Sequence, residues 1–259
     1  MDATAVIGLI PAAGHARRLG PLPCSKEILP ISTRSKTGPK VACEYLLEHM
    51  RVGGIDQALI VLREGKWDIP ACLGGGERVG VNLAYAITRV PYGVPYTLDQ
   101  AYPFVRDRRV ALGFPDILFN AENAFARLLA AHATTAADVM LGLFPTDAPH
   151  TADMVERQDE RVTGIVVKPP VSALRDTWGI AVWSPRFSRF MHDYLATQLP
   201  HAEHRAELHV GHVIQAAIEA GLAVRGVRVS EEPFLDIGIP QNLAIATSGK
   251  GAWGDLLRE

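Results

Sequence analysis

Short runs of β-branched and apolar residues alternate with stretches of helical period along nearly the whole chain, and this alternation restricts the fold more than any other feature. It is typical of an α/β domain in which helices cover a mostly parallel sheet. The predicted strands are Ala5–Ile10, Ala58–Leu62, Asn82–Ala86, Arg109–Phe114, Val139–Phe144, Gly164–Lys168 and Ile180–Trp183. The sequence therefore predicts an α/β fold with a mostly parallel central sheet flanked by helices.

Two intervening segments carry apolar residues at helical spacing, so each has one face able to cover a sheet. The first contains Phe125, Leu128, Leu129 and His132, and the second contains Val210, Val213, Ile214, Ala217 and Ile218. Gly221 is well placed to end the second helix, because glycine tolerates the left-handed conformation that closes a helix.

No internal repeat or flexible linker divides the 259 residues, and glycine and proline are scattered along them. We therefore expect a single domain. The segment Thr146–Asp159 has little apolar content and is expected to cross the surface between two halves of that domain. The run Gly74–Gly76 is expected to be a turn, since no lysine or hydroxyl residue follows it at phosphate-loop spacing.

The bulk properties exclude several classes of protein. A formal net charge of -2 gives no positive field for a nucleic acid, although a local basic loop could still bind a small anion. No stretch approaches the ~20 apolar residues of a membrane-spanning helix, and Asp2 stands where a secretory signal would be positive. Cys24, Cys43 and Cys72 lack metal-site spacing and predict free thiols. We expect a cytoplasmic protein without nucleic-acid or membrane partners, and a homo-oligomer is left open.

The first predicted strand leads directly into a segment rich in small residues and cations. Residues 8–31 read GLIPAAGHARRLGPLPCSKEILPI. Small residues let backbone N–H groups approach an anion closely, and the cations that follow suit a triphosphate. The segment matches neither the P-loop nor the dinucleotide-binding fingerprint. A tight turn with solvated arginines is the alternative interpretation.

Two motifs in this segment resemble the signature of the sugar-1-phosphate nucleotidyltransferases, the nucleoside-diphosphate-sugar pyrophosphorylases. The family's loop runs [LP]-A-[AG]-G-x-[GA]-x-R-L and then S-K-x-[LI]-L-P, and Pro11–Leu19 and Ser25–Pro30 match both parts. The resemblance extends from Ile7 to about Ala246 and is best to the glucose-1-phosphate thymidylyltransferase-like and uridylyltransferase branches. It implies a Rossmann-like, glycosyltransferase-A-like fold with a nucleotide-binding half (residues 1–145) and a sugar-phosphate acceptor half (residues 146–259).

The resemblance also assigns roles within the loop. It implies that Arg18 and Lys26 grip the triphosphate and stabilise the charge that builds on the departing pyrophosphate. Backbone at Ala12, Ala13 and Gly14 would lie against the nucleotide.

Two further positions in the loop carry expectations of their own. Ala16 stands where the family commonly has a second glycine, and this change is expected to tighten the loop. Cys24 lies two residues before Lys26, and that positive charge is expected to lower the pKa of its thiol.

Transfer to a phosphate oxygen calls for Mg²⁺ held by one or two carboxylates and by the phosphates. Asp116 follows a predicted strand, at the kind of edge where open sheets bind ligands, and the family's corresponding aspartate binds the metal. Asp236 lies in Pro233–Pro240, which resembles the family's W-x-D-[IT]-G-T-P, where a second aspartate completes the site. For Asp116, a loop-capping role is the alternative.

The acceptor half contains two more matches. Lys168 ends a segment that resembles the family's E-K-P strand end, which implies that it contacts the phosphate of the sugar 1-phosphate. Val167 stands where the family often has a glutamate that hydrogen-bonds sugar hydroxyls. Gly179 resembles a glycine whose backbone lies against the sugar, and an ordinary strand glycine is the alternative.

Other substrate contacts are expected on two segments. Leu98–Ala101 resembles the helix start of the family's base-reading region, which makes Gln100 a substrate-binding candidate. Glu207 and His212, on a predicted helix Glu207–Gly221, are candidates for sugar contact. The loosely spaced histidines His201, His204, His209 and His212 could alternatively bind zinc or be ordinary polar residues.

The predicted reaction is attack of a sugar 1-phosphate on the α-phosphorus of a nucleoside triphosphate, with dTTP or UTP favoured, to release pyrophosphate without a covalent enzyme intermediate. Two alternatives stay open. One is a cytidylyl- or guanylyltransferase for another phosphorylated acceptor, and the other is a catalytically silent binding or regulatory protein. The presence of both cations, both acids and Lys168 argues against the silent form.

Overall fold

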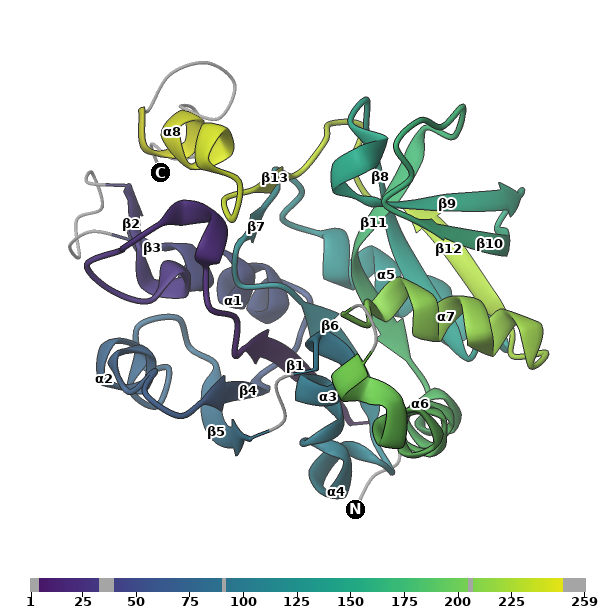
Figure 1. Ribbon diagram of the computed structural model, residues 1–259, viewed down its shortest axis with the longest axis horizontal. Coiled ribbons are helices and arrows are strands. Elements are labelled where there is room, and N and C mark those ends of the chain that lie inside the picture. The colour runs from purple at the N-terminus through teal and green to yellow at the C-terminus, as the bar shows by residue number, and fades with distance from the viewer. Residues whose placement is uncertain (1–4, 33–39, 90–91, 205–206, 249–259) are drawn as a thin grey trace.

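The computed structural model describes residues 5–32, 40–89, 92–204 and 207–248, without the side chains at 32, 201, 203 and 204, and is built on a nine-stranded sheet (Figure 1). Pro91, at the start of the predicted base-reading region, lies outside these residues. The strand order is β5 (Asn82–Thr88), β4 (Gln57–Arg63), β1 (Val6–Ala12), β6 (Arg109–Gly113), β11 (Asp176–Trp183), β8 (Val139–Pro145), β12 (Val224–Arg228), β10 (Arg161–Val167) and β9 (Asp153–Gln158).

The predicted fold class is confirmed, and all seven predicted strands are present. The pairings make only β11 and β10 run against the direction of the other strands of this sheet. Strands such as β1 and β11 are buried on both faces, which explains why they read as continuous apolar runs.

Helices cover both faces of the sheet. On one face, α1, α2 and α5 contribute apolar side chains to a core that includes Ile10 and Ile60, and on the other face α3, α4, α6 and α7 pack over Leu9 and Leu141. The helices are α1 (Ala42–Val52), α2 (Asp68–Leu73), α3 (Val94–Asp99), α4 (Tyr102–Val105), α5 (Ala124–Thr134), α6 (Pro185–Gln198), α7 (Val210–Glu219) and α8 (Pro240–Ser248). Short 3-10 turns are η1 (Arg17–Leu19), η2 (Lys26–Ile28), η3 (Pro149–Thr151) and η4 (Leu199–His204).

A third, smaller core holds the two short strand pairs in place. β7 (Ile117–Leu118) pairs with β13 (Leu235–Asp236), and β2 (Pro30–Ser32) pairs with β3 (Lys40–Val41). Apolar residues from these strands, α1 and α8 pack together, and Figure 1 shows α8 beside them. This cluster fixes residue 236, late in the chain, against the region that follows β6.

Two expectations about helices are tested directly. Both predicted packing helices exist, as α5 and α7, and Gly221 follows α7 with a φ of 81°. The expectation of a helix start at Leu98–Ala101 is wrong, because α3 begins earlier and ends at Asp99. The stronger start signal was Pro95, in the first turn of α3. The φ of proline suits a helix, and the N–H that proline lacks would have no partner in the first turn.

The segment Thr146–Asp159 differs from the expectation of a surface crossing. It forms η3 and then the edge strand β9, which pairs with β10 and touches β11. Its polar residues misled the prediction because the last part of this edge strand is exposed to solvent on both faces, as at Glu156, Arg157 and Gln158. Strand β12, which reads VRGVR, was also missed.

The described helices include none with the combination of length and apolar character that crossing a bilayer requires.

Gly76 offers a test of the predicted Gly74–Gly76 turn, which is present at the end of α2. Its φ is 91°, and a Cβ there would lie 1.8 Å from the Val81 carbonyl oxygen. Gly76→Ala should therefore lower the free energy of unfolding by about 3 kcal/mol or more, measured by urea denaturation. Gly54→Ala is the control, because its φ of 80° is similar but no atom would lie within 4 Å of the new Cβ. Equal losses in the two variants would contradict the steric argument.

Candidate active site

Three consecutive residues after the first loop are each tied to a different part of the fold. The Ser25 backbone N–H and hydroxyl donate to Asp68 at 2.7 and 2.8 Å. Lys26 donates to and forms an ion pair with Asp116. Glu27 accepts from Lys66 through both carboxylate oxygens at 2.7 Å. These ties hold the loop that joins β1 to η2 at the carboxyl end of the parallel strands.

The Glu27–Lys66 pair is almost fully withdrawn from solvent, with side-chain exposures of 1% and 5%. Lys66 also donates to the Ala12 carbonyl oxygen at 2.8 Å. Burial raises the pKa of Glu27 and lowers that of Lys66, while their mutual attraction acts in the opposite direction for both. Each charge therefore depends on the other to remain ionised in the interior.

Asp116 and Asp236 are brought together by the short strand pair β7 and β13. The Ile237 N–H donates to the Asp116 carbonyl oxygen at 2.9 Å, which locks the two backbone segments in register. The Gly238 N–H donates to the Asp236 carboxylate at 2.8 Å, and Asn242 donates to the Asp236 carbonyl oxygen at 3.0 Å. Two aspartates that are distant in the sequence thus face one small space.

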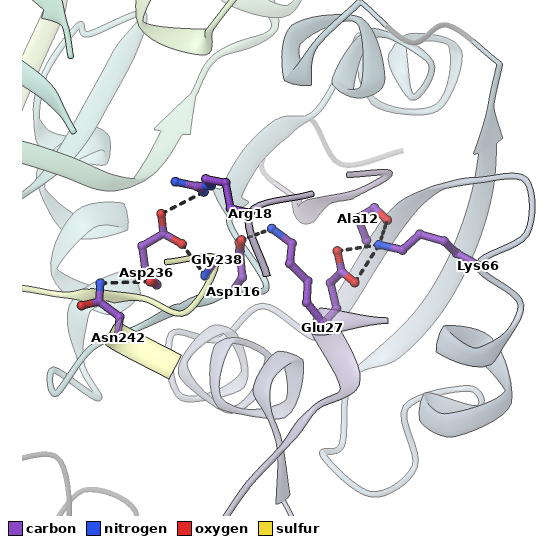
Figure 2. A network of polar contacts seen from close by, with 9 residues as sticks. Ala12, Arg18, Glu27, Lys66, Asp116, Asp236, Gly238 and Asn242 are labelled. Carbon is purple, nitrogen blue, oxygen red and sulfur yellow. Dashed lines mark hydrogen bonds and ion pairs between the residues drawn. The ribbon is translucent and has the colours of Figure 1, made fainter. Parts of the chain in front are cut away.

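Each aspartate is matched by a cation from the first loop. Lys26 contacts Asp116, and the Arg18 guanidinium lies 3.5 Å from Asp236, as Figure 2 shows for the latter pair. Burial opposes the charge on Lys26, but the charge of Asp116 and its hydrogen bond prevail and raise the pKa of Lys26. Burial and then the negative charge of Asp116 raise the pKa of Asp236, against the Gly238 N–H, Arg18 and Lys26.

Gly238 lies between the charged groups and leaves room for them. A Cβ at this position would lie 2.8 Å from an Asp236 carboxylate oxygen, 3.0 Å from Arg18 and 3.4 Å from Asp116. A side chain here would push the carboxylates and the guanidinium apart. Glycine therefore suits the position for packing reasons alone.

The loop itself is positively charged and open. Burial, followed by the charges of Arg63, Arg17 and Lys66, lowers the pKa of His15, so several cations lie close to its ring. Gly14 is exposed, and a Cβ there would have no atom within 4 Å. An anion could approach this backbone without steric hindrance.

Ala16 adopts a left-handed conformation with φ 54° and ψ 29°. This conformation is unfavourable for any residue with a Cβ and natural for the glycine expected at this position in related loops.

The predicted lowering of the Cys24 pKa is wrong. Burial raises the pKa of the Cys24 thiol most, and the charges of Asp68, Cys72 and Glu27 raise it further. All three cysteines are free thiols, as predicted.

Lys168 lies at the end of β10, some way along the sheet from these acids, with a left-handed φ of 43°. Its ammonium is 3.5 Å from the His209 ring. Its charge also acts on the neighbouring Asp153 carboxyl. His209 precedes α7, and its N–H donates to the His212 ring at 3.1 Å.

The remaining predicted substrate contacts are distributed unevenly. Gly179 lies in β11 with its Cβ direction filled by the rings of Phe234 and Phe144, at 3.0 and 3.2 Å. Exposed Glu207 lies near His209 and against Gly93, where α3 begins. Gln100 is not brought to the loop. It lines a surface pocket of about 680 Å³ together with Ile7, Gln57 and Arg108, toward the opposite end of β1 and β4.

Several residues of this region were not singled out from the sequence. Glu27, Lys66 and Asp68 anchor the loop, and Asp153 lies beside Lys168. Glu27 occupies the variable position of the S-K-x-[LI]-L-P motif, so the motif carried no signal for it. The available signal was a lysine three residues after a buried strand, as at Lys66, since a lysine that becomes buried there requires an acidic partner.

The carboxylates of Asp116 and Asp236 are suitable ligands for a hard divalent cation that also binds phosphate. Within the described ranges, no three His, Cys, Asp or Glu side chains gather closely enough to hold a metal ion by themselves. Asp116 and Asp236 supply two carboxylates, and such a pair with substrate phosphates is a usual arrangement for Mg²⁺. Among the described residues, His209 and His212 have no third side chain close enough to complete a zinc site. The side chains of His201 and His204 lie outside the described residues.

Comparison with known proteins gives a family match and two relatives. The model of a family described as nucleotidyl transferase matches residues 7–251. A low-salt glycan biosynthesis nucleotidyltransferase, Agl11, from Haloferax volcanii is 24% identical over 242 residues, covering 91% of this chain and 63% of the relative. A glucose-1-phosphate thymidylyltransferase from Streptomyces griseus is 27% identical over 229 residues, covering 86% and 60%. The chain thus spans less than two thirds of the length of these relatives.

A solved structure shares the fold. It is that of a Bacillus anthracis protein assigned as a glucose-1-phosphate thymidylyltransferase, in complex with sucrose. The two superpose with a TM-score of 0.81 at 20% identity, over 98% of this chain and 96% of the other.

Loss of one member of the buried ion pair should destabilise the protein. Lys66→Met leaves the Glu27 carboxylate buried without its cation, and we expect the free energy of unfolding to fall by about 3–5 kcal/mol in urea denaturation. Adding Glu27→Gln to Lys66→Met should restore part of this loss, because the stranded charge disappears. Glu160→Gln, which breaks an exposed 3.5 Å pair with Arg225, is the control and should cost about 1 kcal/mol or less. A double variant no more stable than Lys66→Met would contradict the charge argument.

Proposed function

The chain belongs to the nucleotidyl transferase family, and from this premise we propose that it transfers a nucleoside monophosphate from a nucleoside triphosphate to a sugar 1-phosphate. Pyrophosphate is the second product. The family match confirms the resemblance that Pro11–Leu19 and Ser25–Pro30 indicated. The observation that carries the proposal is the pairing of two acids with two cations from the first loop, Asp116 with Lys26 and Asp236 with Arg18.

In this proposal the first loop holds the triphosphate. Arg18 is 61% exposed and can turn from Asp236 toward a phosphate, whereas Lys26 is held at 15% exposure beside Asp116. Their charges stabilise the pyrophosphate as negative charge builds on it. The open backbone at Ala13 and Gly14, and Ala12 before them, lies against the nucleotide. The positive surroundings of His15 support an anion at this place.

Members of the family generally depend on a divalent metal ion, and we propose Mg²⁺ held by Asp116 and Asp236. When bound, the ion neutralises charge on the phosphates and so lets an anionic oxygen approach the α-phosphorus. Burial and then the negative charge of Asp116 raise the pKa of Asp236, and a cation between the two carboxylates would relieve their repulsion.

The acceptor is assigned to residues 146–259, with residues 1–145 binding the nucleotide. Lys168 holds the acceptor phosphate by charge, and Glu207 and Gly179 lie on segments that can border the sugar. A phosphate oxygen of the acceptor forms the new bond to the α-phosphorus, the bond to the bridging oxygen of pyrophosphate breaks, and the leaving group carries the electron pair away. Orientation and charge stabilisation supply the rate, with no covalent enzyme intermediate.

Two finer assignments accompany the proposal. The two relatives favour a nucleotide-sugar product, and one of them is a thymidylyltransferase, which supports dTTP, while UTP stays a prediction. A cytoplasmic location fits three free thiols and a nucleoside triphosphate substrate. Gln100, which lines a separate pocket, receives no support as a base-reading residue and stays a prediction.

A substrate panel tests the proposed reaction. The protein should release pyrophosphate from dTTP or UTP when supplied with Mg²⁺ and a sugar 1-phosphate, and Asp116→Asn should lower kcat/KM by at least about a hundredfold. Asp107→Asn is the matched control, since that aspartate is 73% exposed and pairs with Arg189 on the surface. Absence of turnover with each of dTTP, UTP, CTP and GTP in combination with the common hexose 1-phosphates, or full activity of Asp116→Asn, would overturn the assignment.

Asp236 should show a conflict between stability and activity. Its folded pKa lies above its ordinary value of 3.8, so the folded protein retains this proton over a pH range in which the unfolded chain has released it. Stability falls as the pH rises through that range, and the full penalty is present at neutral pH. Asp236→Asn should therefore raise the Tm at pH 7 by about 2–4 °C, corresponding to ~1 kcal/mol, while abolishing turnover. The gain should shrink toward acid pH, and a lower Tm at pH 7 would contradict the like-charge argument.

A further inference from the structure

Two buried polar atoms on neighbouring strands β9 and β11 have no hydrogen-bond partner within the described residues. They are the Asp153 carboxylate oxygen Oδ1, an acceptor, and the Trp178 indole Nε1–H, a donor. Trp178 is 6% exposed, so its N–H is removed from bulk water. Leaving such groups unpaired is unfavourable, and buried polar atoms of this kind are usually satisfied by a water or a ligand.

The pairing of β11 with β9 brings these two residues to neighbouring positions. β11 and β9 run antiparallel with Thr177 paired to Met154. Trp178 and Asp153 lie directly next to this pair on the two strands, and the Thr177 hydroxyl donates to the Asp153 carbonyl oxygen at 2.8 Å, so the antiparallel direction brings the two residues close to one another. Alternation along each strand also puts both on the same face of the sheet.

That face is the one covered by α7. A Cβ at Gly211, in the first turn of α7, would lie 2.4 Å from the second carboxylate oxygen of Asp153. Trp178 belongs to the core cluster that contains Val210 and Val213 from the same helix. The Cβ direction of Gly179, next in β11, points to the rings of Phe144 and Phe234 in the core of the opposite face. The donor and the acceptor thus lie on the same face of the sheet, under α7.

The neighbours of Trp178 and Asp153 connect these two side chains to both halves of the candidate active site. The Trp178 ring lies 5.8 Å from the ring of Phe114, two residues before Asp116. On the other side, the charges of Lys168 and His212 act on Asp153, and Lys168 contacts His209. Trp178 thus lies near the segment that leads to Asp116, and Asp153, which pairs with Val167 in the β9–β10 ladder, lies beside the residue that precedes Lys168.

We propose that Trp178 and Asp153 together bind a hydroxyl group of the acceptor, an inference that rests on the proposed function. A hydroxyl group can accept from the indole N–H and donate to the carboxylate at the same time, whereas a carbonyl or ether oxygen can only accept. The acceptor is thus a polyhydroxylated phosphate whose phosphate meets Lys168 and one of whose hydroxyl groups meets this pair. Val167, beside Lys168, has no polar atom to perform that task, and Asp153 supplies the carboxylate instead.

Calorimetric binding to the intact protein, in the presence and absence of a non-hydrolysable dTTP analogue, tests the inference apart from turnover. The probes are glucose, galactose, mannose and N-acetylglucosamine 1-phosphates, with inorganic phosphate as the reference that lacks hydroxyl groups on carbon. Trp178→Phe and Asp153→Asn should each weaken the binding of the best hydroxylated probe about tenfold or more, with binding of inorganic phosphate unchanged. Trp67→Phe and Asp107→Asn, at exposed positions, are matched controls.

A deoxy series on the wild-type protein identifies the hydroxyl group without relying on any variant. Removal of one particular hydroxyl group from the best probe should weaken wild-type binding about tenfold, and the same removal should cost Trp178→Phe little more. The inference is overturned if both variants bind the hydroxylated probes as the wild type does, which would assign the two atoms to a buried water. It is also overturned if no hydroxylated probe binds more tightly than inorganic phosphate. Intact, variant-sensitive binding without pyrophosphate release would instead contradict the proposed reaction alone.

Discussion

The buried contact of Lys66 with Glu27 and the Ala12 carbonyl oxygen is the interaction on which the arrangement of the candidate site depends. It joins the end of β1, the 3-10 turn after the first loop and the segment between β4 and α2. A loop rich in glycine, alanine and proline has little side-chain packing of its own, so its position must be set by its ends. With Glu27 fixed on one side and Ser25 on the other, Lys26 has a defined direction toward Asp116.

The second half of the charge arrangement comes from a different part of the chain. β13 reaches Asp116 through a two-residue strand pair, and the Ile237 N–H and the Gly238 N–H hold Asp236 in place. The positive charges of Arg18 and Lys26, from the loop, partly offset the repulsion between the two carboxylates. A site of this kind is destabilising in isolation and is held by the packing of α1, α8 and the short strands around it.

Much of the fold and the outline of the site followed from the sequence, because both rest on local patterns. Strands buried on both faces read as apolar runs, and the paired loop motifs located Arg18 and Lys26. Contacts set by long-range pairing had no local signal: Lys66 meets Glu27 only after β4 joins β1, and Trp178 comes near Asp153 only through the pairing of β11 with β9. The edge strand β9 looked like a loop because its last three residues are polar and exposed.

The position of β12 has a consequence for how the chain acquires its structure during synthesis. β12 is made after β10 yet lies between β8 and β10 in the sheet. A ribosome-bound chain that ends before residue 224 can assemble β5, β4, β1 and β6, but β8 and β10 still lack the neighbour that joins them. Residues 224–236 then supply β12 and Asp236 almost together, so a nascent chain that ends before residue 236 lacks part of the candidate site.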